Sequence, residues 1–255
     1  MRLTVVGSSD AFNAAGRGHS CYLLEGEGVA PLMVDFGATA LAAMRRVGRA
    51  PSEIEAVAVT HLHGDHVGGI PFLLLDGMFH VVRRRPLALL GPVGLTQAIE
   101  AGLRVAYSDV VDLAKPYEVR FQELSPGDRA ELAGWQVEAF AADHMDPPDQ
   151  PLCLRFTAPG GTTVAFSGDS TFSSGLRAAG DGVDLFVAEC SCLRPPCGRH
   201  CTWEDWREAL PTISARRVVL AHLNAEVRER ADELLAETAG AVDLRFADDG
   251  MQIEL

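Results

Sequence analysis

The sequence predicts an α/β protein in which helices cover the outer faces of two β-sheets. Short apolar runs typical of strands occur in both halves of the chain, and segments of helical composition alternate with several of them. Gly- and Pro-rich turns separate these segments. The length of 255 residues is sufficient for one domain with a large core, so we expect residues 1–255 to form a single domain.

The first half of the chain begins with short strands and continues with alternating helices and strands. Apolar runs separated by Gly-containing segments predict strands at residues 3–6, 21–24 and 32–34. Residues 39–47 have helical composition, and residues 54–59 form an apolar run typical of a buried strand. Apolar residues over 67–82 fit a further helix, although two glycines and Pro71 make its start irregular.

The second half predicts the other sheet. Further strands are expected at residues 117–124, 130–132, 136–140, 152–156, 163–166, 185–188 and 218–221. Helices at 203–210 and 226–238 would cover the outside of this sheet. Residues 244–255, around Asp248-Asp249-Gly250, predict a final hairpin.

Composition and charge exclude some classes of function. The chain is 47% apolar and 22% charged, and no segment approaches the roughly twenty apolar residues of a membrane span. The apolar run after Met1 is too short for a signal peptide, so we expect a cytoplasmic protein that does not cross a membrane. A formal charge of −13 repels phosphate backbones, which argues against a large nucleic-acid partner but still permits a small anionic substrate.

Four of the six cysteines lie close together, at Cys190, Cys192, Cys197 and Cys201. In a cytosolic chain we expect these thiols to be reduced rather than joined in disulfides. The alternative is a structural zinc bound by some of them together with His200, although the spacing lacks the paired C-x-x-C elements of common zinc modules.

The segment from Thr60 to His66 has the composition of a metal site. It places three imidazoles and a carboxylate within six residues, as Thr60-His61-Leu62-His63-Gly64-Asp65-His66. Neutral imidazoles and a carboxylate are suitable ligands for zinc, and also for iron or manganese. The cluster follows the predicted strand 54–59, and active sites of open α/β sheets commonly lie at such carboxyl ends.

A site for two metal ions needs more ligands than this cluster supplies, and the later part of the chain offers them. His144, Asp169 and His222 each follow a predicted strand, so their side chains can point into a shared cleft. A lone histidine at a strand end is more often structural than a ligand. Together with the cluster, however, these three residues indicate a metal site.

These motifs resemble those of the metallo-β-lactamase fold superfamily over most of the chain. The resemblance implies a four-layer αββα sandwich, with two mixed sheets flanked by helices. It also implies a site for two divalent metal ions, with Zn²⁺ expected and Mn²⁺ or Fe²⁺ as alternatives. In this site one ion would be held by His61, His63 and His144, the other by Asp65, His66 and His222, and both by the bridging Asp169.

The resemblance favours the hydrolase branches of the superfamily, because ordinary class B β-lactamases usually carry a different ligand where Asp169 stands. Two nearby divalent ions lower the pKa of a shared water, so the expected chemistry is hydrolysis. Asp65 and Asp169 would balance the charge of the ions. We therefore count Asp65 among the catalytic residues as well as among the ligands. Asp35 is either an acceptor for a ligand imidazole or a turn residue.

Two further residues bear on the bond that is broken. His200 precedes Thr202, which could cap the helix that follows, and this arrangement resembles the His-Ser/Thr motif of ribonuclease Z and related phosphodiesterases. In that group the histidine assists the leaving group and is supported by an acid on the preceding strand, which here would be Glu189. The alternative is that His200 is a solvent-exposed loop residue.

The spacing of the ligands favours a small substrate. Only twenty-five residues separate His144 from Asp169, which leaves no room for the long tRNA-gripping arm of ribonuclease Z. The leading hypothesis is therefore a phosphodiesterase acting on small cyclic or nucleotide-type diesters. The alternatives are a thioesterase or lactonase of the glyoxalase II type, an iron-dependent oxidoreductase, a tRNA 3′-processing nuclease and a non-catalytic binding protein. Related proteins are often homodimers, so a second copy is a possible partner.

Overall fold

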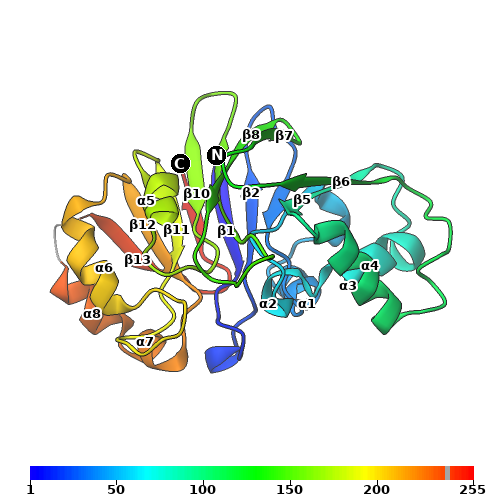
Figure 1. Ribbon diagram of the computed structural model, residues 1–255. Coiled ribbons are helices and arrows are strands. Elements are labelled where there is room, and N and C mark those ends of the chain that lie inside the picture. The colour runs from blue at the N-terminus through cyan, green and yellow to red at the C-terminus, as the bar shows by residue number, and fades with distance from the viewer. Residues whose placement is uncertain (239–241) are drawn as a thin grey trace.

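Two mixed β-sheets lie face to face in the centre of the molecule, and helices cover their outer faces (Figure 1). The computed structural model describes residues 1–238 and 242–255. This arrangement confirms the predicted four-layer αββα sandwich with two mixed sheets. In the described residues, no helix is both long enough and apolar enough to cross a membrane.

The first sheet has the strand order β14-β1-β2-β3-β4-β5-β6. Its pairs are antiparallel from β14 to β3 and parallel from β3 to β6. Its strands are β1 (Arg2–Gly7), β2 (Cys21–Glu25), β3 (Leu32–Val34), β4 (Ala56–Ala58), β5 (Leu87–Pro92), β6 (Val119–Leu124) and β14 (Gln252–Glu254).

The second sheet has the order β13-β12-β11-β10-β9-β8-β7. It repeats the pattern of the first, because β7 to β10 pair antiparallel and β10 to β13 pair parallel. Its strands are β7 (Arg129–Leu132), β8 (Trp135–Ala141), β9 (Leu152–Thr157), β10 (Thr163–Phe166), β11 (Leu185–Glu189), β12 (Arg217–Ala221) and β13 (Asp243–Phe246). The parallel strands of both sheets have carboxyl ends at which loops can gather functional side chains.

The helices divide between the two outer faces. The first sheet is covered by α1 (Ala40–Arg46), α3 (Ile70–Leu75) and α4 (Leu95–Ala106), after the single turn α2 (Gly64–Val67). The second is covered by α5 (Ser174–Gly180), α6 (Trp203–Ala209) and α8 (Ala231–Glu237), with α7 (Ala225–Glu229) before α8. Shorter helical turns are η1 (Ala14–Gly16), η2 (Pro51–Glu53), η4 (Leu210–Thr212) and the wide turn η3 (Asp76–His80).

Several predicted elements differ from the observed ones. The closing segment 244–255 is not a hairpin, because β13 pairs with β12 in the second sheet whereas β14 pairs with β1 in the first. The predicted helix 67–82 is divided into α2, α3 and η3. At the break, a Cβ on Gly69 would lie 2.3 Å from the carbonyl oxygen of Gly37, so α3 can start there only without a side chain. The sequence patterns described above do not predict β5, α4 or α5.

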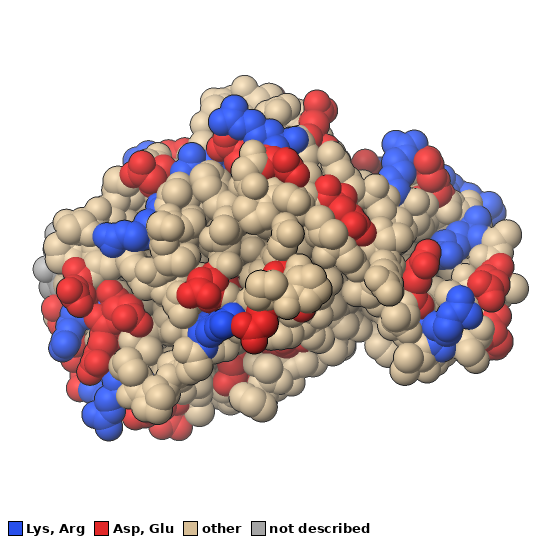
Figure 2. All heavy atoms as spheres, in the orientation of Figure 1, with Lys and Arg blue, Asp and Glu red and all other residues tan. Residues whose placement is uncertain are grey.

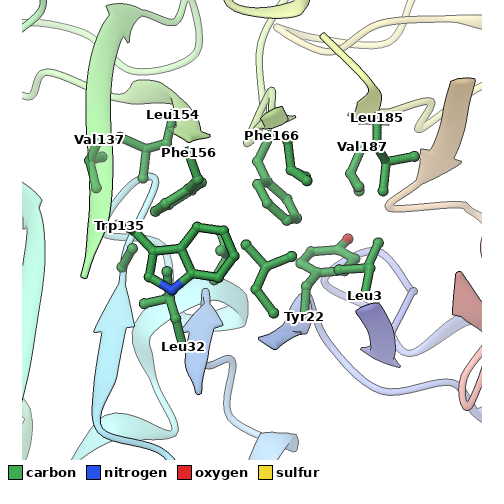
Figure 3. Close-up of a cluster of buried hydrophobic side chains, with 14 of the residues drawn as sticks. Leu3, Tyr22, Leu32, Trp135, Val137, Leu154, Phe156, Phe166, Leu185 and Val187 are labelled. Atoms are coloured by element: carbon green, nitrogen blue, oxygen red, sulfur yellow. The ribbon is translucent and has the colours of Figure 1, made fainter. Parts of the chain in front are cut away.

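An apolar core fills the space between the two sheets (Figure 3). Leu3, Tyr22 and Leu32 of the first sheet face Phe156 and Phe166 of the second. The Tyr22 and Phe166 rings pack at a centroid distance of 5.4 Å. Side chains alternate between the two faces of a strand. The strand residues that lie between these inward-facing ones therefore point to the outer helices.

The indole of Trp135 closes one end of this core. The side chain is fully buried, packs edge-on against Phe156 and donates a hydrogen bond from Nε1 to the carbonyl oxygen of Ala30. It therefore ties β8 of the second sheet to the turn between β2 and β3 of the first.

We expect Trp135→Ala to lower the free energy of unfolding by about 3–5 kcal/mol, because it removes a buried aromatic side chain and leaves a cavity. Urea denaturation followed by circular dichroism measures this loss. Val105→Ala is the matched control, since Val105 is 90% exposed and its truncation should leave the midpoint unchanged. Equal stability of the Trp135 variant and the wild-type protein would contradict the packing described here.

Candidate metal centre

The seven residues that the sequence singled out as ligands come together at one end of the sandwich. The cluster from His61 to His66 follows β4 and runs into α2, while His144, Asp169 and His222 follow β8, β10 and β12. Their potential ligand atoms form two groups, and within each group these atoms lie within 4.8 Å of one another. The groups are His61, His63 and His144, and Asp65, His66, Asp169 and His222.

The first group consists of three imidazoles. Nδ1 of His63 lies 3.0 Å from Nε2 of His144. The other ring nitrogen of His144, Nδ1, donates to the carbonyl oxygen of Arg199 at 2.9 Å. His61 is buried, and its Nδ1 lies 3.2 Å from Oγ1 of Thr60, so its Nε2 is directed to the interior of the group.

The second group combines two imidazoles with two carboxylates. Oδ2 of Asp65 lies 3.2 Å from Nε2 of His222 and 3.5 Å from Nε2 of His66. Asp169 lies between the two groups, because its carboxylate oxygens approach imidazole nitrogens of both. The distances are 3.3 Å to His66 and His222 and 3.7 Å to His61 and His144.

The donor set fits divalent cations. Within the described part of the chain, buried Nε2 of His61, Nε2 of His66 and Oδ1 of Asp169 have no hydrogen-bond partner, and all three belong to the two groups. A buried polar atom without a hydrogen-bond partner destabilises the folded state, so three such atoms in the two ligand groups require another explanation. Metal coordination provides one, since it would satisfy each of these atoms with a ligand type that zinc, manganese or iron accepts.

Asp35 orients the second group from outside. Its buried carboxylate accepts hydrogen bonds from Thr60 N at 2.8 Å and from Nδ1 of His66 at 2.7 Å, which leaves Nε2 of His66 facing the other ligands. Asp35 also has a positive φ of 56°, so it combines the acceptor role with that of a turn residue. Nearby, a Cβ on Gly37 would lie 2.1 Å from the carbonyl oxygen of Asp65, so glycine allows the ligand loop to approach.

Burial and charge set the protonation of these imidazoles. Burial lowers the pKa of His61 well below its ordinary value, and the neighbouring His66 lowers it further. The His61 ring is therefore neutral, which is the form that binds metals. Burial also lowers the pKa of His222, but the negative charge of Asp169 and the hydrogen bond to Asp65 outweigh it and raise the pKa to about 9. The carboxylates thus favour positive charge at this position.

His200 and Glu189 meet beside the two groups. Nδ1 of His200 lies 3.1 Å from Oε1 of Glu189, a carboxylate at the end of β11 that is 2% exposed. Burial raises the pKa of Glu189. Burial lowers the pKa of His200, but the hydrogen bond and charge of Glu189 outweigh it, so this pKa is also raised. The imidazole of His200 is half-buried rather than a freely exposed loop side chain.

Ser191 is a member of this site that the sequence analysis missed. Its hydroxyl donates to Oε2 of Glu189 at 2.6 Å and lies 2.8 Å from Nδ1 of His222, so it connects the Glu189–His200 pair to a candidate ligand. Ser191 follows strand β11, as the ligands follow theirs, and this position was the available signal. The hydrogen bond from His144 to the Arg199 carbonyl oxygen could not be predicted from the sequence, because every residue has a backbone carbonyl whatever its side chain.

The cysteine-rich segment corrects one expectation. Cys192 and Cys197 form a disulfide, whereas Cys190 and Cys201 are buried free thiols. The bridge closes the loop immediately before His200, because the fold brings the two Cα atoms to 6.1 Å. In the portion of the chain that the structure describes, no cysteine belongs to a potential metal-binding group, so the structural-zinc alternative gains no support.

A cavity of about 410 Å³ opens over these groups. Candidate ligands of both groups line it together with His200, Ser191, the disulfide, Asn224 and residues 10–12 of the loop between β1 and β2. Loops of both sheets therefore contribute to the lining of one cavity.

Comparison with known proteins agrees with this geometry. A family model described as the anti-Pycsar protein Apyc1 matches residues 1–244. The chain belongs to the Apyc1 family. An uncharacterized protein of Mycobacterium leprae is 28% identical over 228 residues, covering 88% of this chain and 78% of that protein. Ribonuclease Z of Methanosarcina acetivorans is 22% identical and covers 100% of this chain and 98% of its own length.

Solved structures confirm the fold of this Apyc1-family member. The metallo-β-lactamase fold protein YhfI of Bacillus subtilis superposes with a TM-score of 0.77 at 21% identity, covering 99% of both chains. A diphosphatase of the PhnP family gives 0.78 at 15% identity, covering 100% of this chain and 97% of its own. Yeast PDE1 gives 0.74 at 13% identity, covering 100% and 99%. The chain therefore has the metallo-β-lactamase fold that these proteins share.

We expect the purified protein to contain about two divalent ions per chain, and each single-group variant about one. His63→Ala removes a residue of the first group, and His222→Ala removes one of the second. Inductively coupled plasma mass spectrometry measures the content. His80→Ala is the control, since its side chain is 67% exposed and belongs to neither group. Unchanged metal content in both site variants would contradict the assignment.

Proposed function

We propose that the protein is a metal-dependent phosphodiesterase that hydrolyses small anionic diesters of cyclic or nucleotide type. The observation that carries this proposal is the Glu189–His200 pair, which adjoins the candidate metal ligands, with His200 itself lining their cavity. The ligand set accounts for activation of the nucleophile, and His200 accounts for protonation of the leaving group.

The seven candidate ligands would hold two divalent cations, with zinc expected first. When bound, these ions would activate water for attack near neutral pH and neutralise charge on the phosphoryl oxygens. The carboxylates of Asp65 and Asp169 would offset part of the positive charge of the two ions. The loaded site would still bind an anionic substrate. Asp35 and Ser191 would hold the rings of His66 and His222 in the orientations that ligation requires.

His200 is suited to act as a general acid. Because Nδ1 is engaged by Glu189, the proton available to a substrate is the one on Nε2. Oε1 of Glu189 also accepts a hydrogen bond from Ser170 N at 2.6 Å, so this carboxylate is fixed and in turn fixes the imidazole. The raised pKa of His200 favours the protonated ring that could donate to a leaving alkoxide.

Three features favour a small substrate over a long RNA. The cavity of about 410 Å³ matches the size of small-molecule sites. Only a short loop joins β8, which ends at Ala141, to β9, which begins at Leu152, so this described connection holds no long arm. The formal charge is −13, and on the face in Figure 2 basic side chains are interspersed with acidic ones.

The lining of the cavity favours a diester in particular. Among the described residues that line it there are acidic groups and histidines but no lysine or arginine. A diester carries one negative charge, whereas a monoester carries up to two, so a lining without lysine or arginine suffices for a diester once the ions are bound. Ribonuclease Z, yeast PDE1 and the PhnP-family diphosphatase are similar to this chain, which adds support for phosphate-ester chemistry.

A substrate panel with the metal-loaded enzyme tests the proposal. We expect hydrolysis of bis(p-nitrophenyl) phosphate and of cyclic nucleotides, with little turnover of acyl-thioesters or lactones. Loss of activity after chelation and its return with zinc or manganese would be the matched control. Turnover of thioesters or lactones while the diesters stay intact would contradict the proposal and favour the glyoxalase II-like alternative.

The leaving group tests the role of His200. We expect His200→Ala to lower kcat by about a hundredfold or more for a cyclic nucleotide, whose alkoxide leaving group needs a proton. The loss should be much smaller for bis(p-nitrophenyl) phosphate, because p-nitrophenolate leaves without protonation. Steady-state kinetics on both substrates measures the difference. Equal losses on the two would remove His200 from the acid role.

A further inference from the structure

The disulfide between Cys192 and Cys197 lies in the lining of the cavity over the candidate metal centre. Both cysteines are partly exposed, so a reductant in solution can reach the bridge. The bridge spans five positions of the loop between β11 and α6. In the described part of the chain the groups of potential metal ligands contain neither cysteine, so the proposed hydrolysis gives this bridge no role.

The base of this loop is held together without the disulfide. Trp203 N donates to the carbonyl oxygen of Cys192 at 2.8 Å, and Ser191 N donates to the carbonyl oxygen of Cys201 at 3.1 Å. These backbone hydrogen bonds join the two ends of the loop. The ends therefore stay side by side when the bridge is broken, and α6 keeps its place.

The tip of the loop, which comprises residues 194–200, contacts the metal centre directly. The carbonyl oxygen of Arg199 accepts a hydrogen bond from Nδ1 of His144 at 2.9 Å, and His200 follows in the chain. Cys197 lies two residues before Arg199, so the bridge fixes the chain next to the acceptor for His144. Loss of an acceptor that orients a ligand imidazole typically lowers metal affinity by about 10–100-fold.

The side chain of Arg199 adds only a weak constraint on the tip. Its Nη2 lies 2.6 Å from Oδ1 of Asp146, and the two side chains are 45% and 83% exposed. Such an exposed ion pair contributes little to stability. Residues 194–196 are exposed as well. The covalent bond between Cys192 and Cys197 is therefore the constraint whose loss would release the tip.

The remaining thiols are protected from reagents in solution. Four other cysteines are buried free thiols, namely Cys21, Cys153, Cys190 and Cys201. Burial raises the pKa of each of them, so these thiols stay protonated and react slowly near neutral pH. A thiol reagent added to the folded protein therefore reports on the bridge alone.

We propose that Cys192 and Cys197 form a thiol–disulfide exchange site through which a dithiol reductant loosens the metal centre. One thiolate of the reductant attacks a sulfur of the bridge, the S–S bond breaks, and the released sulfur takes up a proton. The second thiol of the reductant then resolves the mixed disulfide. The protein gains two thiols and two electrons, while the dithiol loses both protons and is oxidised to a disulfide.

Breaking the bridge would act on the first ligand group. The released tip withdraws the Arg199 carbonyl from His144, so the imidazole loses its fixed orientation and the ion beside it is held less tightly. His200 lies on the same tip, so hydrolysis would decline with metal affinity. For this effect on hydrolysis the proposal rests on the phosphodiesterase function proposed above.

Alkylation of the folded protein tests whether the bridge undergoes exchange. The purified protein is incubated with dithiothreitol and then with excess iodoacetamide, and mass spectrometry of its peptides locates the modified cysteines. We expect modification at Cys192 and Cys197 after reduction and none without dithiothreitol, with the four buried thiols unmodified in both samples. A bridge that stays intact under these conditions overturns the proposal.

Metal affinity tests the consequence of reduction. The wild-type protein in its disulfide form and the double variant Cys192→Ser/Cys197→Ser compete for Zn²⁺ with a chromophoric chelator. We expect the double variant to bind one of two ions about tenfold more weakly. Arg194→Ala is the matched control, because Arg194 is exposed in the same loop and its substitution leaves the bridge in place. Equal affinities of the double variant and the wild-type protein overturn the proposal.

Reversibility separates redox control from a fixed structural defect. The wild-type protein is reduced and freed of dithiothreitol by gel filtration under argon, and we expect the same loss of affinity as in the double variant. Oxidation with glutathione disulfide should restore the affinity of the wild-type protein and leave that of the double variant low. Failure of the wild-type affinity to follow the state of the bridge contradicts the proposal.

Hydrogen exchange distinguishes a released tip from general unfolding. In the double variant we expect faster exchange of the amides in residues 194–200, with the amide of Trp203 and those of α6 unchanged. Faster exchange throughout α6 would overturn the proposal. If no diester is hydrolysed but metal affinity follows the bridge, the proposed function fails and the exchange site stands. If diesters are hydrolysed but affinity is independent of the bridge, the exchange site fails and the proposed function stands.

Discussion

The arrangement of the site depends on the convergence of buried ligand atoms on the carboxylate of Asp169. Nitrogen atoms from four imidazoles lie within 3.3–3.7 Å of this carboxylate, and several of the buried atoms have no partner in the described chain. The αββα sandwich makes this possible, because the carboxyl ends of strands from both sheets meet there. Without cations, these buried unpaired polar atoms would destabilise the folded state.

Different residues determine what the site does with a substrate. The ligand groups specify metal-assisted hydrolysis, but they do so in the same way for esters, lactones and phosphates. In our account the Glu189–His200 pair allows hydrolysis of diesters with poor leaving groups, and a lining without lysine or arginine suits a singly charged diester. Loops of both sheets line the cavity, so one substrate would contact residues from each sheet.

The sequence predicted an α/β fold and the His61–His66 cluster from strong local signals, whereas the four-layer sandwich and the complete ligand set followed from the resemblance to the metallo-β-lactamase fold superfamily. The cluster from His61 to His66 is compact, and the later ligands all follow apolar strands. The final strands were mispredicted as a hairpin because pairing partners distant in sequence leave no local trace, and β14 pairs with β1 at the other end of the chain. The disulfide and the acceptor for His144 were missed for the same reason, since each depends on the path of the loop before His200.

The most direct test of this account is a crystal structure of the metal-loaded protein with a nucleoside monophosphate, using anomalous scattering to locate the ions. We predict two anomalous peaks, one in each ligand group, with the phosphate beside them and a phosphate oxygen within hydrogen-bond distance of Nε2 of His200. A single peak, ions outside the two groups, or a phosphate that binds away from His200 would contradict the account.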